Sequence, residues 1–282
     1  MASDAHAHPY NLLERFPGAE EERRSLGVAC AASAWNGEQF AYHRELARSA
    51  RKAGAAPMAL CFALHPQLPA AVSAGDIPEI PAGAEDGPAW APLLDLLETL
   101  AEEGALNAVG ETGFDLYDAR FRATEAVQDE LFALHLETAL RYALPLVIHV
   151  RRAMHKIFAH TGSLKKLPAV VFHSWSGTAG EGAALLRRGV NAYFSFGASI
   201  VKNHKEAIRS CAALPLDHLL LETDAPYQPL RGREFSRWAD LSVILKGAAQ
   251  IRHEAGVSGS EPAELEAETD HNFNGVFFPQ AI

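Results

Sequence analysis

Two apolar segments that end in a histidine decide how this chain folds. Residues 145–150 have the sequence PLVIHV, and residues 169–174 have the sequence AVVFHS. Each segment is short and rich in β-branched and aromatic residues, as expected for a buried strand, and a helix is expected between them at 152–161. Buried strands that alternate with helices are typical of βαβ units, in which the strands are parallel.

The same alternation extends in both directions along the 282 residues. Further strands are expected at 3–8, 27–33, 58–65, 106–111, 191–197 and 218–224, and further helices at about 38–53, 91–103, 124–142, 179–188, 202–212 and 234–255. Eight strands predict an α/β protein with a TIM-type (βα)8 barrel, formed by residues 1–282 as a single domain.

Two segments depart from this alternation. Residues 69–92 are rich in Pro and Gly, show no periodicity and are predicted to form a surface-loop insertion. A terminal helix is expected to begin near Ser260, where Ser260 and Glu264 resemble a helix cap.

Composition limits the possible functions. With 48% hydrophobic and 21% charged residues, the chain can bury a full core, which excludes disorder and fibrous repeats. The formal net charge of −10, with 13 His left out, excludes a globally basic surface for gripping nucleic acid. Three Cys without CxxC spacing argue against a disulfide framework or a thiolate metal site. The amino terminus has no cationic stretch followed by an apolar segment, and no apolar run is long enough to span a membrane. We therefore expect a soluble cytoplasmic protein that does not enter a membrane. No obligate protein partner is evident.

Ionisable residues recur where the expected strands end, which is where the active site of a barrel is built. They are His6, His8, His65, Glu111, His149, His173, Glu222 and Asp224.

Each of these positions also has a plain structural interpretation. His6 and His8 are two residues apart and point to the same side of an extended strand, although such a pair also occurs in polar termini. His149 and His173 could each be a neutral core histidine, and Glu222 and Asp224 could be solvated acids at a strand end. Glu111 lies between Gly110 and Gly113, which permit close approach of a ligand to the backbone.

Taken together, four imidazoles and two carboxylates are enough for two divalent ions that share one carboxylate. Zinc, manganese, magnesium or cobalt would suit this mixture of ligands. Two neighbouring ions lower the pKa of a water molecule between them and bind both the attacking and the leaving oxygen of a phosphoryl group. The residues therefore predict a binuclear metal-dependent hydrolase with its metal site at the carboxyl ends of the strands.

The chain resembles the TatD family of metal-dependent deoxyribonucleases, within the amidohydrolase-like hydrolases, over almost its whole length. The resemblance lies in a series of short motifs in a specific order: DAHAH (4–8), LHP (64–66), VGETGFD (109–115), LPLVIHVRRA (144–153), FHSWSG (172–177), FSFG (194–197), LLETDAPY (220–227) and TDHN (269–272). It implies a (βα)8 barrel and a nuclease that cleaves phosphodiester bonds of DNA ends or single strands through a metal-activated water.

The same resemblance implies roles for individual residues. One metal would be held by His6, His8 and Asp224, the second by His149 and His173, and Glu111 would bridge them. His65 would face the scissile phosphate, and Asp224 would also be the general base. Glu222 would orient a ligating histidine from behind.

Contacts with the substrate are expected from the residues that follow the strands. Arg151 and Arg233 could bind phosphate, and Trp175 and Tyr227 could stack on a base, although solvated helix starts and packing at the rim of the site explain them equally well. The turn at 231–236, RGREFS, departs from the family's usual pattern, which puts contacts from that loop in doubt.

Two other functions remain open at this stage. One is an amidohydrolase-type hydrolase of a cyclic amide, ester or lactone. The other is a non-catalytic metal-binding barrel, which the altered turn at 231–236 motivates.

Overall fold

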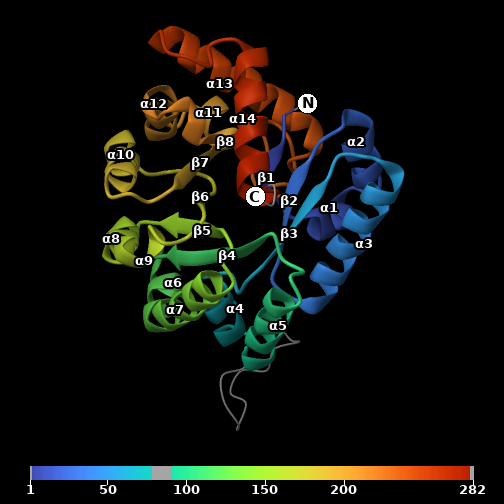
Figure 1. Cartoon of the computed structure of the whole chain (residues 1–282), viewed down its shortest axis with the longest axis vertical. Helices are drawn as coiled ribbons and strands as arrows, with labels where there is room; N and C mark the ends of the chain where they lie inside the picture. The colour runs from blue at the N-terminus through green and yellow to red at the C-terminus, as the bar shows by residue number, and fades with distance from the viewer. Residues whose placement is uncertain (1, 78–89, 280–282) are drawn as a thin grey trace.

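The computed structural model describes residues 2–77 and 90–279, and they form a barrel of eight parallel strands (Figure 1). The strands follow one another around the sheet in chain order, as predicted. Their bounds are β1 Asp4–Ala7, β2 Cys30–Ala34, β3 Met58–Phe62, β4 Ala108–Asp115, β5 Leu146–Arg151, β6 Val170–Phe172, β7 Ala192–Phe196 and β8 Leu219–Leu221.

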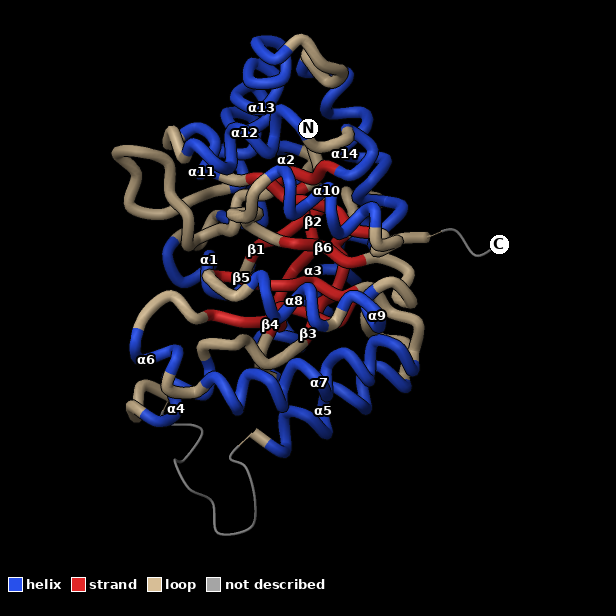
Figure 2. The backbone as a smooth tube through the Cα atoms, turned by 90° about the vertical axis from the view of Figure 1, so that its left-hand side faces the viewer, coloured by secondary structure: helices blue, strands red, loops and turns tan. Residues whose placement is uncertain are grey.

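Helices surround the strands on the outside, as Figure 2 shows, and give the expected single-domain α/β barrel. Almost every strand residue is buried, because one face contacts the helices and the other faces the barrel interior. The helices along the first half are α1 Pro9–Arg15, α2 Ala19–Leu26, α3 Gly37–Ala53, α4 Leu68–Ser73, α5 Ala91–Glu102, α6 Ala119–Arg122 and α7 Glu125–Arg141. Those along the second half are α8 Met154–Ala159, α9 Thr161–Leu164, α10 Ala179–Arg187, α11 Ala198–Val201, α12 Lys205–Ala213, the short η1 Leu216–His218 and η2 Trp238–Asp240, α13 Leu241–Ala255 and α14 Pro262–Phe277.

The barrel interior is narrow, and the C-terminal helix fills one end of it. Small side chains from four strands and from the residue just before β6 meet inside: Ala5, Ala31, Ala59, Ala108 and Ala169. They pack with Phe273 and Phe277 of α14, which crosses the barrel in Figure 1. The site residues lie at the opposite ends of the strands, so α14 supports the barrel away from the site.

The seam between β1 and β8 is joined by individual hydrogen bonds, since no ladder between these two strands appears among the described residues. Asp224 N donates to His6 O at 3.0 Å, and His8 N donates to Ala225 O at 2.8 Å. The buried Asp4 carboxylate accepts from Thr223 N at 3.0 Å and from Thr223 Oγ1 at 2.6 Å. These bonds fix His6 and His8 relative to Asp224.

Two sequence expectations need correction. Part of the segment 69–92 is helical: α4 occupies Leu68–Ser73, because Leu68, Pro69, Ala70 and Val72 are buried, while residues 78–89 lie outside the described part of the chain. The terminal helix begins at Pro262, so its N-cap lies one residue after the expected Ser260. Its N-cap is Glu261, whose side chain makes no capping hydrogen bond.

Candidate metal centre

The centre of the site is Glu111 on β4, whose two carboxylate oxygens face different histidines. Oε2 lies 3.1 Å from His6 Nε2 and 3.7 Å from His8 Nε2. Oε1 lies 2.6 Å from His173 Nε2 and 3.0 Å from His149 Nδ1. Glu111 therefore lies between two histidine pairs, the position expected of a bridging ligand.

The two glycines beside Glu111 allow β4 to approach β5 closely. A Cβ at Gly110 would lie 2.5 Å from Val147 Cβ, and one at Gly113 would lie 2.0 Å from His149 O. Gly113 also has φ +131°, which L-residues with a side chain rarely adopt. The sequence VGETG is thus required for Glu111 and His149 to meet.

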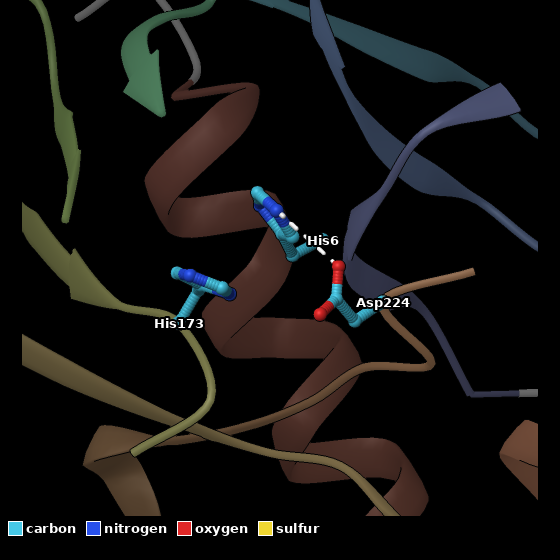
Figure 3. A group of neighbouring side chains, drawn as sticks. All are labelled: His6, His173 and Asp224. Carbon is cyan, nitrogen blue, oxygen red and sulfur yellow. Dashed lines mark ion pairs between the residues drawn. The ribbon is translucent and has the colours of Figure 1, made fainter. Parts of the chain in front are cut away.

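Asp224 completes the first histidine pair. Its Oδ1 lies 3.4 Å from His8 Nε2 and 3.8 Å from His6 Nε2, while Oδ2 accepts from Gln228 Nε2 at 2.9 Å. Figure 3 shows His6 and Asp224 pointing toward one another, with the His173 ring beside them. Segments at opposite ends of the chain thereby contribute to one cluster.

Ring nitrogens approach one another within each pair, which suits a shared cation. His6 Nε2 and His8 Nε2 are 3.1 Å apart, as are His149 Nδ1 and His173 Nε2. Ligands at about 2.0–2.1 Å around a tetrahedral zinc ion are separated by roughly 3.3 Å, close to these distances. Converging lone pairs and carboxylate oxygens at this spacing fit divalent metal ions.

Three overlapping groups among the described residues could each hold an ion: His6, His173 and Asp224; His6, His8 and Glu111; and His65, Glu111 and His149. The last group adds His65, for which the sequence suggested a substrate-facing role. Its Nε2 lies 3.0 Å from Glu111 Oε1. The geometry therefore adds His65 to the residues that could hold the second ion, beside the substrate-facing role that the sequence predicts.

Electrostatics within the cluster favour ionised carboxylates. Burial alone raises the pKa of Glu111, but the surrounding His173, His65 and His6 outweigh it and hold the pKa well below its usual range. The pKa of Asp224 is lowered in the same way, because His8 and His6 outweigh its burial. Both carboxylates thus remain available as metal ligands.

The histidines respond in two ways. Burial, reinforced by His173, lowers the pKa of His6. Burial also opposes a charge on His173, yet Glu111 outweighs it and raises the pKa of His173 well above its usual value. A proton on His173 therefore occupies the place that a cation would take beside Glu111.

Residues behind the cluster hold its histidines in place, and sequence reasoning missed most of them. Asp115 Oδ2 lies 3.1 Å from His149 Nε2 and accepts from Gln67 Nε2 at 2.7 Å. Ser33 Oγ lies 3.3 Å from His6 Nδ1. Asp115 follows Glu111 by four residues on the same strand, so period-two alternation places both on one face and was a usable signal.

Glu222, expected to orient a histidine, lies next to His173. Its Oε1 accepts from Ser174 N at 2.8 Å and from Ser174 Oγ at 2.6 Å, and it lies 3.6 Å from His173 Nδ1. Glu222 thus holds the backbone just after His173, which is consistent with the positioning role suggested by the sequence.

The cluster opens into a cavity of about 1090 Å³, large enough for more than one nucleotide. Of the expected substrate contacts, Arg151 and Tyr227 line it, and Tyr227 is 56% exposed with its ring edge against His8. Trp175 borders the cavity but is 1% exposed and packs on Phe172 and Phe194, which favours its packing interpretation.

The turn at 231–236 lies away from this cavity. None of its residues is among those that line the described part of the cavity, and Arg233 pairs with Asp240 instead, at 3.3 Å between Nε and Oδ1. The departure of this turn from the family pattern therefore leaves the described cavity wall intact.

No helix in the described part of the chain is long and apolar enough to cross a membrane.

Comparisons with known proteins agree with this architecture. A family model described as TatD related DNase matches residues 3–278. The 3'-5' ssDNA/RNA exonuclease TatD of Cronobacter sakazakii is 34% identical over 194 residues, covering 66% of this chain and 70% of the relative. An uncharacterized metal-dependent hydrolase of Mycoplasma pneumoniae is 29% identical over 180 residues, covering 61% of this chain and 66% of the relative.

Solved structures share the fold. The crystal structure of YJJV, a TatD homolog from Escherichia coli K12, superposes with a TM-score of 0.76 at 24% identity, covering 98% of this chain and 97% of that one.

Proposed function

The chain belongs to the TatD related DNase family and is a hydrolase that acts on ester bonds, and we propose that it removes nucleotides from the ends of single-stranded DNA. The observation that carries the proposal is the position of Glu111 between two histidine pairs, within a cavity large enough for a strand end. The name of the Cronobacter relative supports a single-stranded substrate. A cytoplasmic location, expected from the sequence, belongs to the same proposal.

Two divalent ions, chosen among Zn, Mn, Mg and Co, complete the proposed site. His6, His8 and Asp224 would hold one, His149 and His173 the other, and Glu111 would contact both. When bound, such ions act as Lewis acids toward phosphate oxygens and lower the pKa of water. Asp115 and Glu222 keep the two histidines of the second pair in position.

Asp224 is the proposed general base. Its Oδ1 lies next to His8 and is ionised at neutral pH, because His8 and His6 lower the pKa of this carboxyl. Oδ2 is held by Gln228 Nε2, so the carboxylate keeps one orientation. Oδ1 can therefore accept a proton from the water that attacks phosphorus while the rest of the side chain stays fixed.

His65 and Tyr227 are the proposed contacts to the reacting nucleotide. The His65 side chain is 24% exposed in the cavity and touches Glu111, so its ring is positioned to orient the scissile phosphate. Tyr227 presents an exposed ring beside His8, on which a base can stack. Together they would position the last nucleotide over the cluster.

The test is metal-dependent release of nucleotides from single-stranded DNA by the purified protein. Asp224→Asn is expected to lower the rate at least about 100-fold, since general-base catalysis contributes about 10²–10⁴-fold. His149→Ala should also abolish release, whereas Asp95→Asn on the exposed face of α5 should not. Full activity in both site variants, or no activity of the metal-loaded protein on any strand, contradicts the proposal.

A panel of lactones, cyclic esters and cyclic amides separates the remaining enzymatic alternative. Turnover of a panel member together with inertness toward DNA would identify an amidohydrolase-type activity. Metal binding without hydrolysis of either class would identify the non-catalytic barrel.

A further inference from the structure

Two arginines share one tyrosine ring at the wall of the cavity. The guanidinium carbons of Arg151 and Arg152 lie 4.1 Å and 4.5 Å from the centre of the Tyr117 ring. Tyr117 is 46% exposed, and Arg151 retains 40% side-chain exposure, so solvent reaches this group. We call Tyr117, Arg151 and Arg152 the arginine clamp.

The backbone is shaped to bring both arginines to the same ring. Consecutive residues of a strand point to opposite faces, so neighbouring side chains normally separate. Arg151 ends β5, and Arg152 has φ +56°, a left-handed conformation that costs free energy for a residue with a side chain. This turn interrupts the alternation, and Arg152 Nη1 donates to Tyr117 O at 3.1 Å.

The clamp carries more positive charge than its described neighbours offset. Arg151 contacts Asp115 at 3.3 Å, but the same Asp115 oxygen also contacts His149 and Gln67. Arg152 makes no ion pair with any residue in the ranges 2–77 and 90–279. Two neighbouring cations repel each other, and the face of an aromatic ring offsets part of that repulsion. An anion that contacts these guanidinium groups would offset the rest.

The clamp lies beside the metal centre, along the same cavity. Tyr117, Arg151 and Arg152 line the cavity together with His65, Glu111 and His149. A single oxygen, Asp115 Oδ2, lies between Arg151 Nη1 and the candidate ligand His149. An anion at the clamp is thus close to the reacting phosphate but separate from it. Guanidinium groups bind phosphate oxygens in a two-pronged geometry, which makes phosphate the best-suited anion.

From this geometry we propose that the arginine clamp binds the internucleotide phosphate adjacent to the scissile one, so that the enzyme selects strands with at least two phosphates. This inference rests on the proposed nuclease function, because the adjacent phosphate exists only in a nucleic-acid strand. It assigns to Arg152 and Tyr117 a role in substrate length selection.

Short substrates test the inference directly. A trinucleoside diphosphate offers the clamp a second phosphate, and a dinucleoside monophosphate offers only the scissile one. We expect the unaltered enzyme to show a kcat/KM at least about tenfold higher for the longer substrate, because one additional charge-assisted hydrogen bond stabilises the bound complex by at least that factor. In Arg152→Met and in Tyr117→Leu this ratio should fall toward one, while the exposed Arg48→Met on α3 should keep it.

Binding without turnover gives a second readout. The affinity for a single-stranded oligonucleotide, measured in EDTA by fluorescence anisotropy, should fall with salt, with a slope of about 0.7 per phosphate contact. Arg152→Met should reduce that slope by about 0.7, and Arg48→Met should leave it unchanged. Thermal melting of each variant checks that it is folded.

The outcomes separate the two proposals. If the unaltered enzyme cleaves neither short substrate nor any longer strand, the nuclease function itself fails. If it cleaves strands but shows no length preference, or if Arg152→Met and Tyr117→Leu both retain the preference and the salt slope, the clamp inference is overturned.

Discussion

A single carboxylate, Glu111, connects the two halves of the site, and its chemistry explains why no other side chain would replace it. Glu111→Gln exchanges one acceptor oxygen for an NH2 donor that faces a histidine nitrogen, so one histidine pair loses its carboxylate ligand. We expect up to two divalent ions per purified chain and a loss of at least one in Glu111→Gln, measured by elemental analysis. Glu103→Gln, exposed at the end of α5, is the matched control. Equal metal content in the two variants would show that Glu111 is not a ligand.

Gly113 shows how tightly the backbone constrains the same strand. Gly113→Ala would place a Cβ 2.0 Å from His149 O and force alanine to adopt φ +131°. We expect a loss of at least about 2 kcal/mol in the free energy of unfolding, since both overpacking and an incompatible φ destabilise. Urea denaturation measures it. Gly162→Ala in α9, where nothing lies within 4 Å of the added Cβ, should change stability by much less, and similar losses at both positions would refute the steric explanation.

Prediction from sequence succeeded at residues whose neighbours constrain them and failed where the partner is distant in the chain. His149 and His173 follow apolar runs that can only be buried strands, so their meeting at one end of a barrel follows from topology. Asp4 and Ser33 carry no such local signal. Their roles depend on Thr223 and His6, and the sequence does not reveal which polar side chains pair across strands.

Among the elements, the seam between β1 and β8 is held by side chains and by single backbone bonds. The Asp4 carboxylate accepts hydrogen bonds from both the N–H and the hydroxyl of Thr223, and these bonds fix the turn that leads into Asp224. Thr223→Val removes the hydroxyl donor at nearly constant shape and leaves a buried carboxylate oxygen without this partner. We expect a loss of about 1–3 kcal/mol in the free energy of unfolding.

The same variant should act locally on the seam. Amide hydrogen exchange at Asp224, whose N–H donates to His6 O, should accelerate, and metal affinity should fall because His6 and Asp224 shift apart. Thr99→Val, which removes an exposed hydroxyl bond on α5, is the control. Unchanged exchange at Asp224 would mean that the backbone bonds alone hold the seam.

The long helices and all eight strands were predictable, but short helices such as α2 and α4 were not. The sequence of α2, AEEERRSL, contains few apolar residues, and besides Ala19 it buries Arg23, whose guanidinium donates to Val28 O and contacts Glu20. Binary patterning does not recognise a buried arginine as a core residue. For α4, Pro and Gly nearby suggested a loop, although Pro69 occupies the first turn, where a helix tolerates proline.

At the scale of the whole molecule, the net charge of −10 misrepresents the surface that matters. The cavity wall contains Arg151, Arg152, Lys205 and five histidines, against three acidic residues, Glu111, Glu206 and Asp224. The charge still excludes tight, nonspecific coating of duplex DNA, because that requires a broad basic surface. It is compatible with transient binding of one strand end.

Stability of the whole barrel should depend on pH through two histidines that the fold keeps neutral. Burial lowers the pKa of His135 to about 3, and burial together with His8 lowers that of His43 to about 3. His135 connects α7 to β4 and to the segment after β3, with Nε2 accepting from Leu64 N and Nδ1 lying 2.6 Å from Thr112 Oγ1. His43 Nε2 accepts from Tyr10 N, and its Nδ1 has no partner in the described structure.

The sign of the effect follows from proton uptake. Above pH about 6.5 both histidines are neutral in the folded and the unfolded chain, and their contribution is constant. As the pH falls from about 6.5 toward 3, only the unfolded chain binds these two protons, so each histidine lowers the free energy of unfolding by up to about 1.4 kcal/mol per pH unit. Urea denaturation in EDTA at pH 7.5 and pH 5 should show a smaller pH-dependent loss for His43→Gln/His135→Gln than for the unaltered chain. His155→Gln, exposed on α8, should leave that loss unchanged, and an equal loss in all three proteins would show that other groups control acid sensitivity.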